Sequence, residues 1–195
     1  MRLLRKLKQK TIYYLFKLPR ILKYKFLSTA KNIDGKPIIN QAVQFNGLGK
    51  INFGKNVMIG IEQSPLFYST YSYIESRNSD STITIADDCF INNNAIMIAE
   101  GEGIEISAKC LIGINCEIVD SDFHNIEPDL RLDIKSIKTA KVVLEENVFI
   151  GSNVKILKGV RIGKNSVIAN SSVVTKSIPA DVVAGGIPAK VLKNL

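Results

Sequence analysis

The strongest pattern along the chain is a six-residue period of aliphatic positions, which runs from about residue 50 toward the C-terminus. Its clearest members are spaced six apart: Leu144, Ile150, Ile156, Ile162, Ile168 and Val174. Small or β-branched residues stand two positions before them: Val142, Val148, Val154, Val160, Ser166 and Ser172. Because residues two apart in an extended strand point to the same side, each pair faces one interior.

Corner-forming residues complete each unit. The types that most readily adopt left-handed backbone angles come three positions after the aliphatic residue: Asn147, Asn153, Gly159 and Asn165. Each unit is therefore a short strand followed by a corner, and equal sides must wind into a coil whose strands stack one turn apart. The sequence predicts an all-β solenoid. The same frame recurs earlier in the chain, around Phe53, Ile85, Ile91, Ile106 and Ile112.

Two segments interrupt the period and are expected to leave the coil as loops. Residues 61–82 are rich in Ser and Tyr, and residues 125–141 are polar and contain Pro128. Long excursions from a regular solenoid usually carry function. The three cysteines instead occupy the small inward slot of the repeat, which predicts buried packing residues without a catalytic role: Cys89, Cys110 and Cys116.

A second pattern, at helical spacing, covers residues 1–27. Apolar side chains recur at steps of three and four, from Leu3 to Leu22, and nine Lys or Arg residues between Arg2 and Lys25 crowd the remainder. The longest apolar run, residues 12–16, is too short to cross a bilayer, and no signal-peptide cleavage pattern follows it. We expect an amphipathic helix lying on an anionic membrane surface, bent or divided at Pro19. The alternative is a helix that packs on its own domain or on another subunit.

Charge separates this segment from the rest. Residues 1–36 hold 11 Lys or Arg against one acid, Asp34, whereas residues 37–195 hold 15 against 17. We therefore expect a basic helical segment over 1–36, a coil domain over 37–195, and no nucleic-acid partner. Hydrophobic residues make up 46% of the chain and cysteines are few, which is typical of an ordered protein from a reducing cytoplasm. A single histidine excludes multi-histidine metal sites, and no metal is expected.

His124 is that histidine, in the run IVDSDFHNI. Counting in sixes from Ile106 reaches it, so the repeat would bury it, yet the repeat stops immediately afterwards. An imidazole can take up a hydroxyl proton near neutral pH, which makes His124 a candidate general base; the alternative is a hydrogen-bonded packing residue. Asp120 and Asp122 would lie on its side of an extended segment, and either could orient it, with Asp122 preferred. The alternative is that both are solvated loop acids.

The run VFIGSNVKILKGVRIGKNSVIANSSVVTKSIPADVVAGGIPAKVL, together with His124, resembles the hexapeptide-repeat acyltransferases, especially the maltose and galactoside acetyltransferases. The acid-x-acid-x-His arrangement is more similar to the polysaccharide O-acetyltransferases. The resemblance covers residues 50–195 and implies a left-handed parallel β-helix with a C-terminal arm. It also implies homotrimers with active sites between neighbouring subunits, acetyl-coenzyme A as donor, and direct attack of the acceptor without a covalent enzyme intermediate.

The resemblance further implies roles for single residues. His124 would be the base, and Ser152, directly after Gly151, would present its backbone N–H and hydroxyl to the thioester carbonyl, unless it is an ordinary outward serine. Asn94 matches an asparagine that contacts acceptor sugars, but it also occupies a corner slot. The positions that match coenzyme A contacts include three lysines as phosphate partners, although single lysines are often merely solvated: Asn170, Thr175, Lys176, Lys190 and Lys193.

The leading interpretation is an O-acetyltransferase acting on a sugar of a surface polysaccharide or lipid-linked precursor, at the cytoplasmic face of the membrane. Tyr73 and Arg77, with Tyr68 and Tyr71, could stack on or hydrogen-bond that acceptor. One alternative is N-acetylation of an amino-sugar nucleotide, for which base and donor sites would look the same. Another is a non-catalytic solenoid scaffold that binds through the basic helix. A zinc enzyme of the carbonic anhydrase type on this coil would need three His ligands and is excluded.

Overall fold

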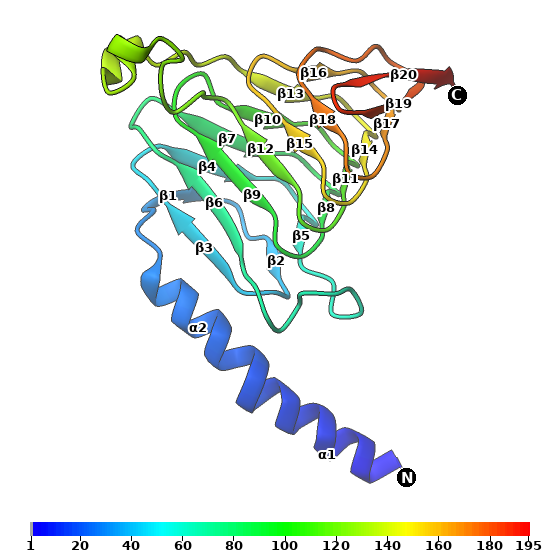
Figure 1. Cartoon of the computed structure of the whole chain (residues 1–195). Helices are drawn as coiled ribbons and strands as arrows, with labels where there is room; N and C mark the ends of the chain where they lie inside the picture. The colour runs from blue at the N-terminus through cyan, green and yellow to red at the C-terminus, as the bar shows by residue number, and fades with distance from the viewer. Residues whose placement is uncertain (1) are drawn as a thin grey trace.

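The computed structural model describes residues 2–195. Figure 1 shows a coil of parallel strands with one long helix projecting from its lower end. The strands form three sheets, and all but the last two go to consecutive sheets in turn, so that each pairs with its counterpart one turn away. The solenoid predicted from the six-residue period is therefore confirmed.

The sheets differ in their number of strands because the C-terminal arm adds strands to one of them. Sheet A contains β1 (Asn32–Asp34), β4 (Lys50–Phe53), β7 (Thr82–Ile85), β10 (Ile104–Ile106), β13 (Val142–Leu144) and β16 (Arg161–Ile162). Sheet B contains β2 (Ile38–Ile39), β5 (Met58–Ile59), β8 (Phe90–Ile91), β11 (Leu111–Ile112), β14 (Phe149–Ile150), β17 (Val167–Ile168), β19 (Val182–Gly186) and β20 (Ala189–Asn194). Sheet C contains β3 (Val43–Asn46), β6 (Ser72–Ser76), β9 (Ile96–Ala99), β12 (Glu117–Val119), β15 (Lys155–Ile156) and β18 (Val173–Val174). We call the turns between them corners AB, BC and CA.

The core is a stack of aliphatic side chains from all three sheets. The predicted period positions from Leu144 to Val174 are fully buried, and all three cysteines lie in the same core. Each such side chain contributes about 1.5–3 kcal/mol by leaving water. The predicted corner residues also adopt the left-handed backbone, with φ of 61° at Asn147, 58° at Asn153 and 62° at Asn165. The repeat thus encodes both the sides and the corners of the coil.

The two excursions differ from their predicted limits. The first occupies only the connection between β5 and β6 at corner BC, so that residues 61–82 are not a single loop. Within that range Ser72, Ile74 and Ser76 point into the core, whereas Tyr73 and Glu75 point outward. Small serines fill the inward slot there, which made a strand look like a loop. The second excursion connects β12 to β13 at corner CA and carries two short 3-10 turns, Pro128–Leu130 and Ile134–Ser136.

The N-terminal segment is one helix made of three parts. These are α1 (Arg2–Ile12), a π-helical turn η1 (Tyr13–Lys17) and α2 (Leu18–Leu27). Pro19 does not divide it, because Pro19 lies in the first turn of α2 and the wider π turn just before it accommodates the missing N–H. No helix within residues 2–195 has both the length and the apolar character needed to cross a bilayer. Strand β1 pairs with β4, so the coil already includes part of the range 1–36 assigned to the helical segment.

Candidate active site

His124 lies on the excursion at corner CA and is exposed, not buried. The chain leaves the coil after Val119, so counting in sixes no longer applies at His124. A short antiparallel stem closes the base of the excursion: Ala140 N–H donates to the Asp120 carbonyl at 2.8 Å, and Asp122 N–H donates to the Lys138 carbonyl at 3.2 Å. The stem therefore holds the histidine-bearing loop against the coil.

A backbone carbonyl fixes the His124 ring. The ring atom Nδ1 lies 3.1 Å from the carbonyl oxygen of Arg131, on the opposite arm of the excursion. A carbonyl can only accept, so Nδ1 carries the proton and Nε2 carries the lone pair. Among residues 2–195 the structure gives Nε2 no hydrogen-bond partner. This tautomer suits a general base, and sequence reasoning missed Arg131 because no periodicity describes the path of the loop.

Asp120 does not contact His124, contrary to one of the two expected arrangements. Its side chain is fully buried, and its carboxylate accepts from three backbone N–H groups: Glu100 at 2.7 Å, Gly101 at 3.1 Å and Gly103 at 2.7 Å. These donors form corner CA of the preceding coil. Asp120 therefore fastens the start of the excursion to the coil beneath it, because it is the first residue after β12.

Asp122 also points elsewhere. Its carboxylate forms an ion pair with Lys158 Nζ at 3.2 Å, on corner CA of the following coil. Both side chains are partly exposed. The left-handed backbone of Phe123, with φ of 59°, separates Asp122 from His124, so the segment is not extended as the pairing would require. Over residues 2–195 neither aspartate makes a hydrogen bond to the imidazole.

A charged cluster on the outer side of sheet C meets the excursion next to His124. Arg77 pairs with Glu75 at 3.0 Å and with Glu100 at 3.3 Å, and its guanidinium lies 5.0 Å from the centre of the Phe123 ring. The hydrogen bonds from Arg77 to these carboxylates raise the pKa of Arg77. The Ser121 hydroxyl donates a hydrogen bond to the Glu100 carboxylate. The same Ser121 oxygen accepts a hydrogen bond from Phe123 N–H at 2.9 Å.

Tyr73 extends this cluster along β6. Its hydroxyl accepts from Asn46 at 3.1 Å and donates to Glu75 at 3.2 Å. Burial is the largest cause of its raised pKa. The structure thus brings Tyr73 and Arg77 together beside the His124 excursion, and adds Glu75 and Glu100, which the repeat pattern did not distinguish from other outward residues. Tyr71 lies apart, because its ring stacks on Tyr24 of α2 at 4.0 Å.

Ser152 occupies corner BC, not corner CA. Its backbone N–H donates to the side-chain oxygen of Asn170 on the next coil at 2.8 Å, so that donor is already engaged. Gly151 precedes it where coils approach closely, since a Cβ there would lie 2.4 Å from the Asn170 oxygen. Gly151, Ser152 and Asn170 therefore form one contiguous corner, and the Ser152 hydroxyl is the donor this residue retains for a ligand.

The other positions matched to coenzyme A are distributed around the coil. Thr175 and Lys176 are exposed just after β18, at corner CA of the last turn. Lys190 and Lys193 lie on β20, where they pair with Gly185 and Val183 of β19. Lys190 is thus near the corner-BC end of sheet B, and Lys193 is near its opposite end. One chain alone does not gather these five residues into one groove.

Asn94 belongs to a ladder of corner asparagines. It adopts φ of 60°, and its side-chain amide donates to Asn115 at 2.6 Å, which in turn donates to Asn153 at 2.8 Å. Its backbone N–H donates to Gln41 at 3.0 Å. These contacts are those of a corner residue, as one of the two interpretations of Asn94 predicted. Asn94 lies on the opposite edge of sheet C from the His124 excursion.

His124 and Ser152 are consequently separated within one chain. His124 follows sheet C at corner CA, whereas Ser152 precedes sheet C at corner BC. A strand and its flanking residues separate those corners, and five extended residues span about 16 Å. Within one chain, the two residues therefore lie too far apart to contact one small thioester together.

Sheet B presents an apolar outer face. Its outward residues stack in register from coil to coil, because each pairs with the next: Ile38, Met58, Phe90, Leu111, Phe149, Val167 and Val183. On sheet A the corresponding ladder is largely polar, with Asn52, Thr84, Glu105 and Arg161 in it. Phe90, Leu111 and Phe149 each leave more than 40% of their surface exposed, which marks this face as an interaction surface.

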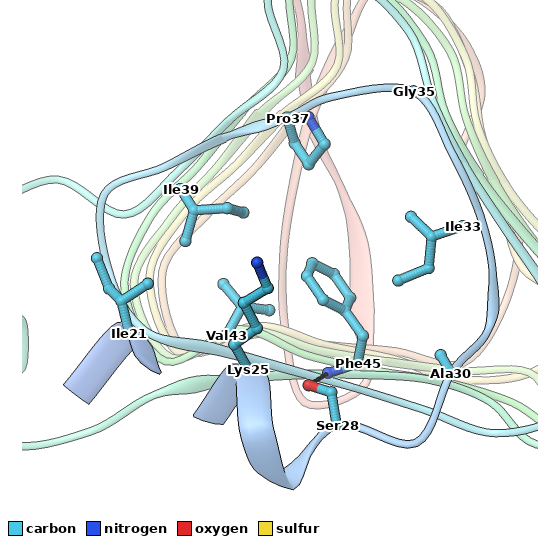
Figure 2. A pocket seen from close by; sticks show the side chains of 10 residues that line it. All are labelled: Ile21, Lys25, Ser28, Ala30, Ile33, Gly35, Pro37, Ile39, Val43 and Phe45. Atoms are coloured by element: carbon cyan, nitrogen blue, oxygen red, sulfur yellow. Dashed lines mark hydrogen bonds between the residues drawn. The ribbon is translucent and has the colours of Figure 1, made fainter. Parts of the chain in front are cut away.

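A pocket lies beneath the first coil, away from His124. It has a volume of about 570 Å³ and is lined by residues of α2 and of the first coil (Figure 2). The lining residues fall between Ile21 and Phe45. In the described part of the chain, no group of three or more His, Cys, Asp or Glu side chains is arranged to hold a metal ion.

Comparison with known proteins agrees with the repeat. Residues 141–176 match the family described as bacterial transferase hexapeptide (six repeats). The chain is 29% identical over 75% of its length to WbbJ of Escherichia coli K12, a candidate lipopolysaccharide-biosynthesis O-acetyltransferase, of which it covers 72%. It is 34% identical over 73% of its length to a galactoside O-acetyltransferase of Lactococcus lactis, of which it covers 62%, less than two thirds of that protein.

A solved structure shows the same architecture. The hexapeptide-repeat acetyltransferase VCA0836 of Vibrio cholerae, crystallised with acetyl-coenzyme A, superposes with a TM-score of 0.52 at 30% identity. The match covers 73% of this chain and 64% of that one. The coil is thus the left-handed parallel β-helix that the resemblance implied. In its repeat, its fold and these likenesses, the chain is similar to the hexapeptide-repeat acyltransferases.

Proposed function

We propose that this protein transfers an acetyl group from acetyl-coenzyme A to a sugar hydroxyl, with His124 as the general base. One observation carries the proposal: the carbonyl of Arg131 holds Nδ1 of the only histidine in its protonated form, which leaves Nε2 as acceptor on an exposed loop. The likeness to two O-acetyltransferases and to an acetyltransferase crystallised with acetyl-coenzyme A supports the reaction type.

The reaction would proceed by direct attack. His124 Nε2 takes the proton of the acceptor hydroxyl while that oxygen forms a bond to the thioester carbonyl carbon. The C–S bond then breaks, and the coenzyme A thiolate leaves and takes the proton from the imidazolium. The Arg131 carbonyl stabilises the imidazolium in between, as a carboxylate does in a hydrolase triad. The Ser152 hydroxyl would stabilise the developing oxyanion, because the Ser152 N–H is engaged by Asn170.

The active unit would be a homotrimer in which neighbouring subunits share each site. The apolar ladder of sheet B provides a surface for association, since Phe90 and Phe149 stay exposed in a single chain. One subunit would contribute His124, and its neighbour would contribute the corner that carries Ser152, Asn170 and, for a phosphate, Lys190. This arrangement explains why one chain separates the base from the donor positions.

The acceptor would bind along the outer side of sheet C. Tyr73, Glu75 and Arg77 lie next to the His124 excursion and offer a ring, a carboxylate and a guanidinium. Sugars are bound by such combinations of stacking and hydrogen bonding. We propose that the acceptor is a sugar of a surface polysaccharide or of its lipid-linked precursor.

The decisive variant is His124→Asn. An asparagine amide can still donate to the Arg131 carbonyl, but it offers no base. With acetyl-coenzyme A and galactoside acceptors, we expect turnover to fall about 100-fold or more, while the oligomer and coenzyme A binding stay intact. An amino-sugar acceptor assayed in parallel separates O-transfer from N-transfer. Turnover close to wild type would remove His124 from the mechanism.

Mixing subunits tests the shared site. A His124→Asn protein and an Asn170→Ala protein are each expected to be poorly active, and they are unfolded, mixed in equal amounts and refolded together. In a trimer with sites between subunits, about one quarter of the interfaces then combine an intact His124 with an intact donor corner. Activity should therefore rise well above that of either variant refolded alone. Mixtures no more active than their components would place the whole site in one chain.

A further inference from the structure

The lower end of the coil is open. Strands β1, β2 and β3 stand at the ends of their sheets, so no coil lies beneath them. The inward residues of this first turn line the pocket of about 570 Å³ described above, and Figure 2 shows Ile33, Pro37, Ile39 and Phe45 around it. In every later coil such side chains are covered by the next turn, whereas Ile33 keeps 38% of its surface exposed.

Helix α2 stands beside the pocket without closing it. The helix contributes Ile21 and Lys25 to the lining, and Lys25 is the one charged residue among the lining residues. Its side chain reaches over the pocket in Figure 2. Arg20 holds the helix in place by donating to the carbonyls of Tyr68 and Thr70 on the first excursion. An ammonium group is therefore positioned at the mouth of an apolar hollow.

The rest of the helix continues this character. No acidic residue precedes Asp34, and large apolar side chains stand in solvent along the helix: Leu3, Leu4, Leu7, Leu15, Phe16 and Phe26. Copies of such a segment would repel one another, because every one carries positive charge alone. A partner with many negative charges above an apolar interior matches both features, and an anionic bilayer has that composition.

We propose that the helix and the open end of the coil form one membrane-docking surface, in which an acyl chain of an anionic phospholipid enters the pocket and its phosphate contacts Lys25. The coil then stands with its lower end toward the bilayer, and the His124 excursion lies at a fixed height above it. This inference goes beyond the transfer reaction, since it concerns a lipid that is not consumed.

The test uses the full chain and a single introduced tryptophan, because the sequence contains none. Ile33→Trp places the probe in the pocket, and Asn32→Trp places it one residue away on the outer side of the same strand. Vesicles of phosphatidylglycerol whose acyl chains carry bromine quench a tryptophan that they touch. We expect Ile33→Trp fluorescence to fall at least three-fold more than that of Asn32→Trp, and phosphatidylcholine vesicles to have little effect on either.

Paired variants assign the contacts by vesicle co-sedimentation. Lys25→Gln should weaken binding to phosphatidylglycerol vesicles more than Lys8→Gln, which removes the same charge farther along the helix. Ala30→Phe fills the pocket and should lower binding at least three-fold, whereas Ala180→Phe adds the same ring on an exposed site elsewhere and should not. Thermal melts of all variants check that the coil remains folded.

Three results would overturn the proposal. Equal quenching of the two tryptophans would mean that no chain enters the pocket. Equal losses for Lys25→Gln and Lys8→Gln would mean that the helix binds by charge alone. Failure of the full chain to bind phosphatidylglycerol vesicles would refute it by itself, and loss of the oligomer when residues 1–27 are removed would then make the helix an assembly element. The transfer assays with soluble acceptors do not depend on any of these outcomes.

Discussion

Replacing Asp120 should lower the free energy of unfolding of the protein without changing the chemistry of His124. The buried Asp120 carboxylate accepts hydrogen bonds from the backbone N–H groups of Glu100, Gly101 and Gly103. A hydrogen bond to a charged group contributes about 1.5–3 kcal/mol, and a buried donor left unpaired costs about 1–3 kcal/mol. Water entering the vacated space recovers part of this. We therefore expect Asp120→Ala to lower the free energy of unfolding by about 4 kcal/mol, and Asp120→Asn by about 2 kcal/mol.

Urea unfolding followed by far-ultraviolet circular dichroism measures this loss, at one fixed protomer concentration because the assembly contributes to stability. The matched control is Asp122→Asn, two residues away. Its partly exposed pair with Lys158 at 3.2 Å should contribute about 0–1 kcal/mol. The reasoning fails if Asp120→Asn unfolds like wild type while its turnover and pH–rate profile change. Asp120 would then act on His124, as the alternation of acids in the sequence suggested.

Three further outcomes are expected. Arg77→Lys keeps the positive charge but loses the guanidinium that pairs with two carboxylates, so kcat/KM should fall about ten-fold. Unchanged steady-state kinetics would show that this charged cluster takes no part in the reaction. Replacing all three cysteines by alanine should preserve turnover. Because burial raises the pKa of Cys116 to about 11, a thiol reagent at pH 8 should modify that side chain only after unfolding. Rapid labelling of Cys116 in the native protein would contradict this. Hydrogen bonds from Lys109 and Lys164 lower the pKa of Glu146 to about 2, so its stabilising effect is present at neutral pH and is lost as pH falls from about 4.5 to about 2. Glu146→Gln should therefore melt with a smaller difference between pH 7 and pH 3 than wild type does.

The coil could be predicted from the sequence because its contacts repeat. Leu144, Ile150 and Ile156 are inward for the same reason, and one register places them all. The corners follow as well, since left-handed backbone angles favour Asn and Gly. The apolar ladder of sheet B had a readable signal too: Phe90 and Phe149 directly precede inward isoleucines, where an outward residue would ordinarily be polar.

The site could be predicted only in part, because it lies where the repeat stops. The chemistry of the imidazole made His124 a candidate base, but its hydrogen-bond partner is the backbone carbonyl of Arg131, and any residue type could supply a carbonyl. The expected acid pairing assumed an extended segment, whereas Phe123 turns the chain with a positive φ. Asp120 was assigned to catalysis because acids near a histidine suggest a triad, yet its burial serves the coil. Loop geometry of this kind depends on tertiary contacts that a local pattern does not contain.

The position of the second excursion also explains how easily such a loop can be accommodated. In the regular coil Val143 pairs with Arg161, 18 residues later, whereas across the excursion Glu105 pairs with Val143, 38 residues later. Closing the longer loop costs only about 0.7 kcal/mol more, because closure entropy grows with the logarithm of length. The strands on either side keep their register, and Asp120 anchors the base of the insertion. The loop that carries His124 can therefore lengthen, shorten or change sequence during evolution while the coil that presents it stays the same.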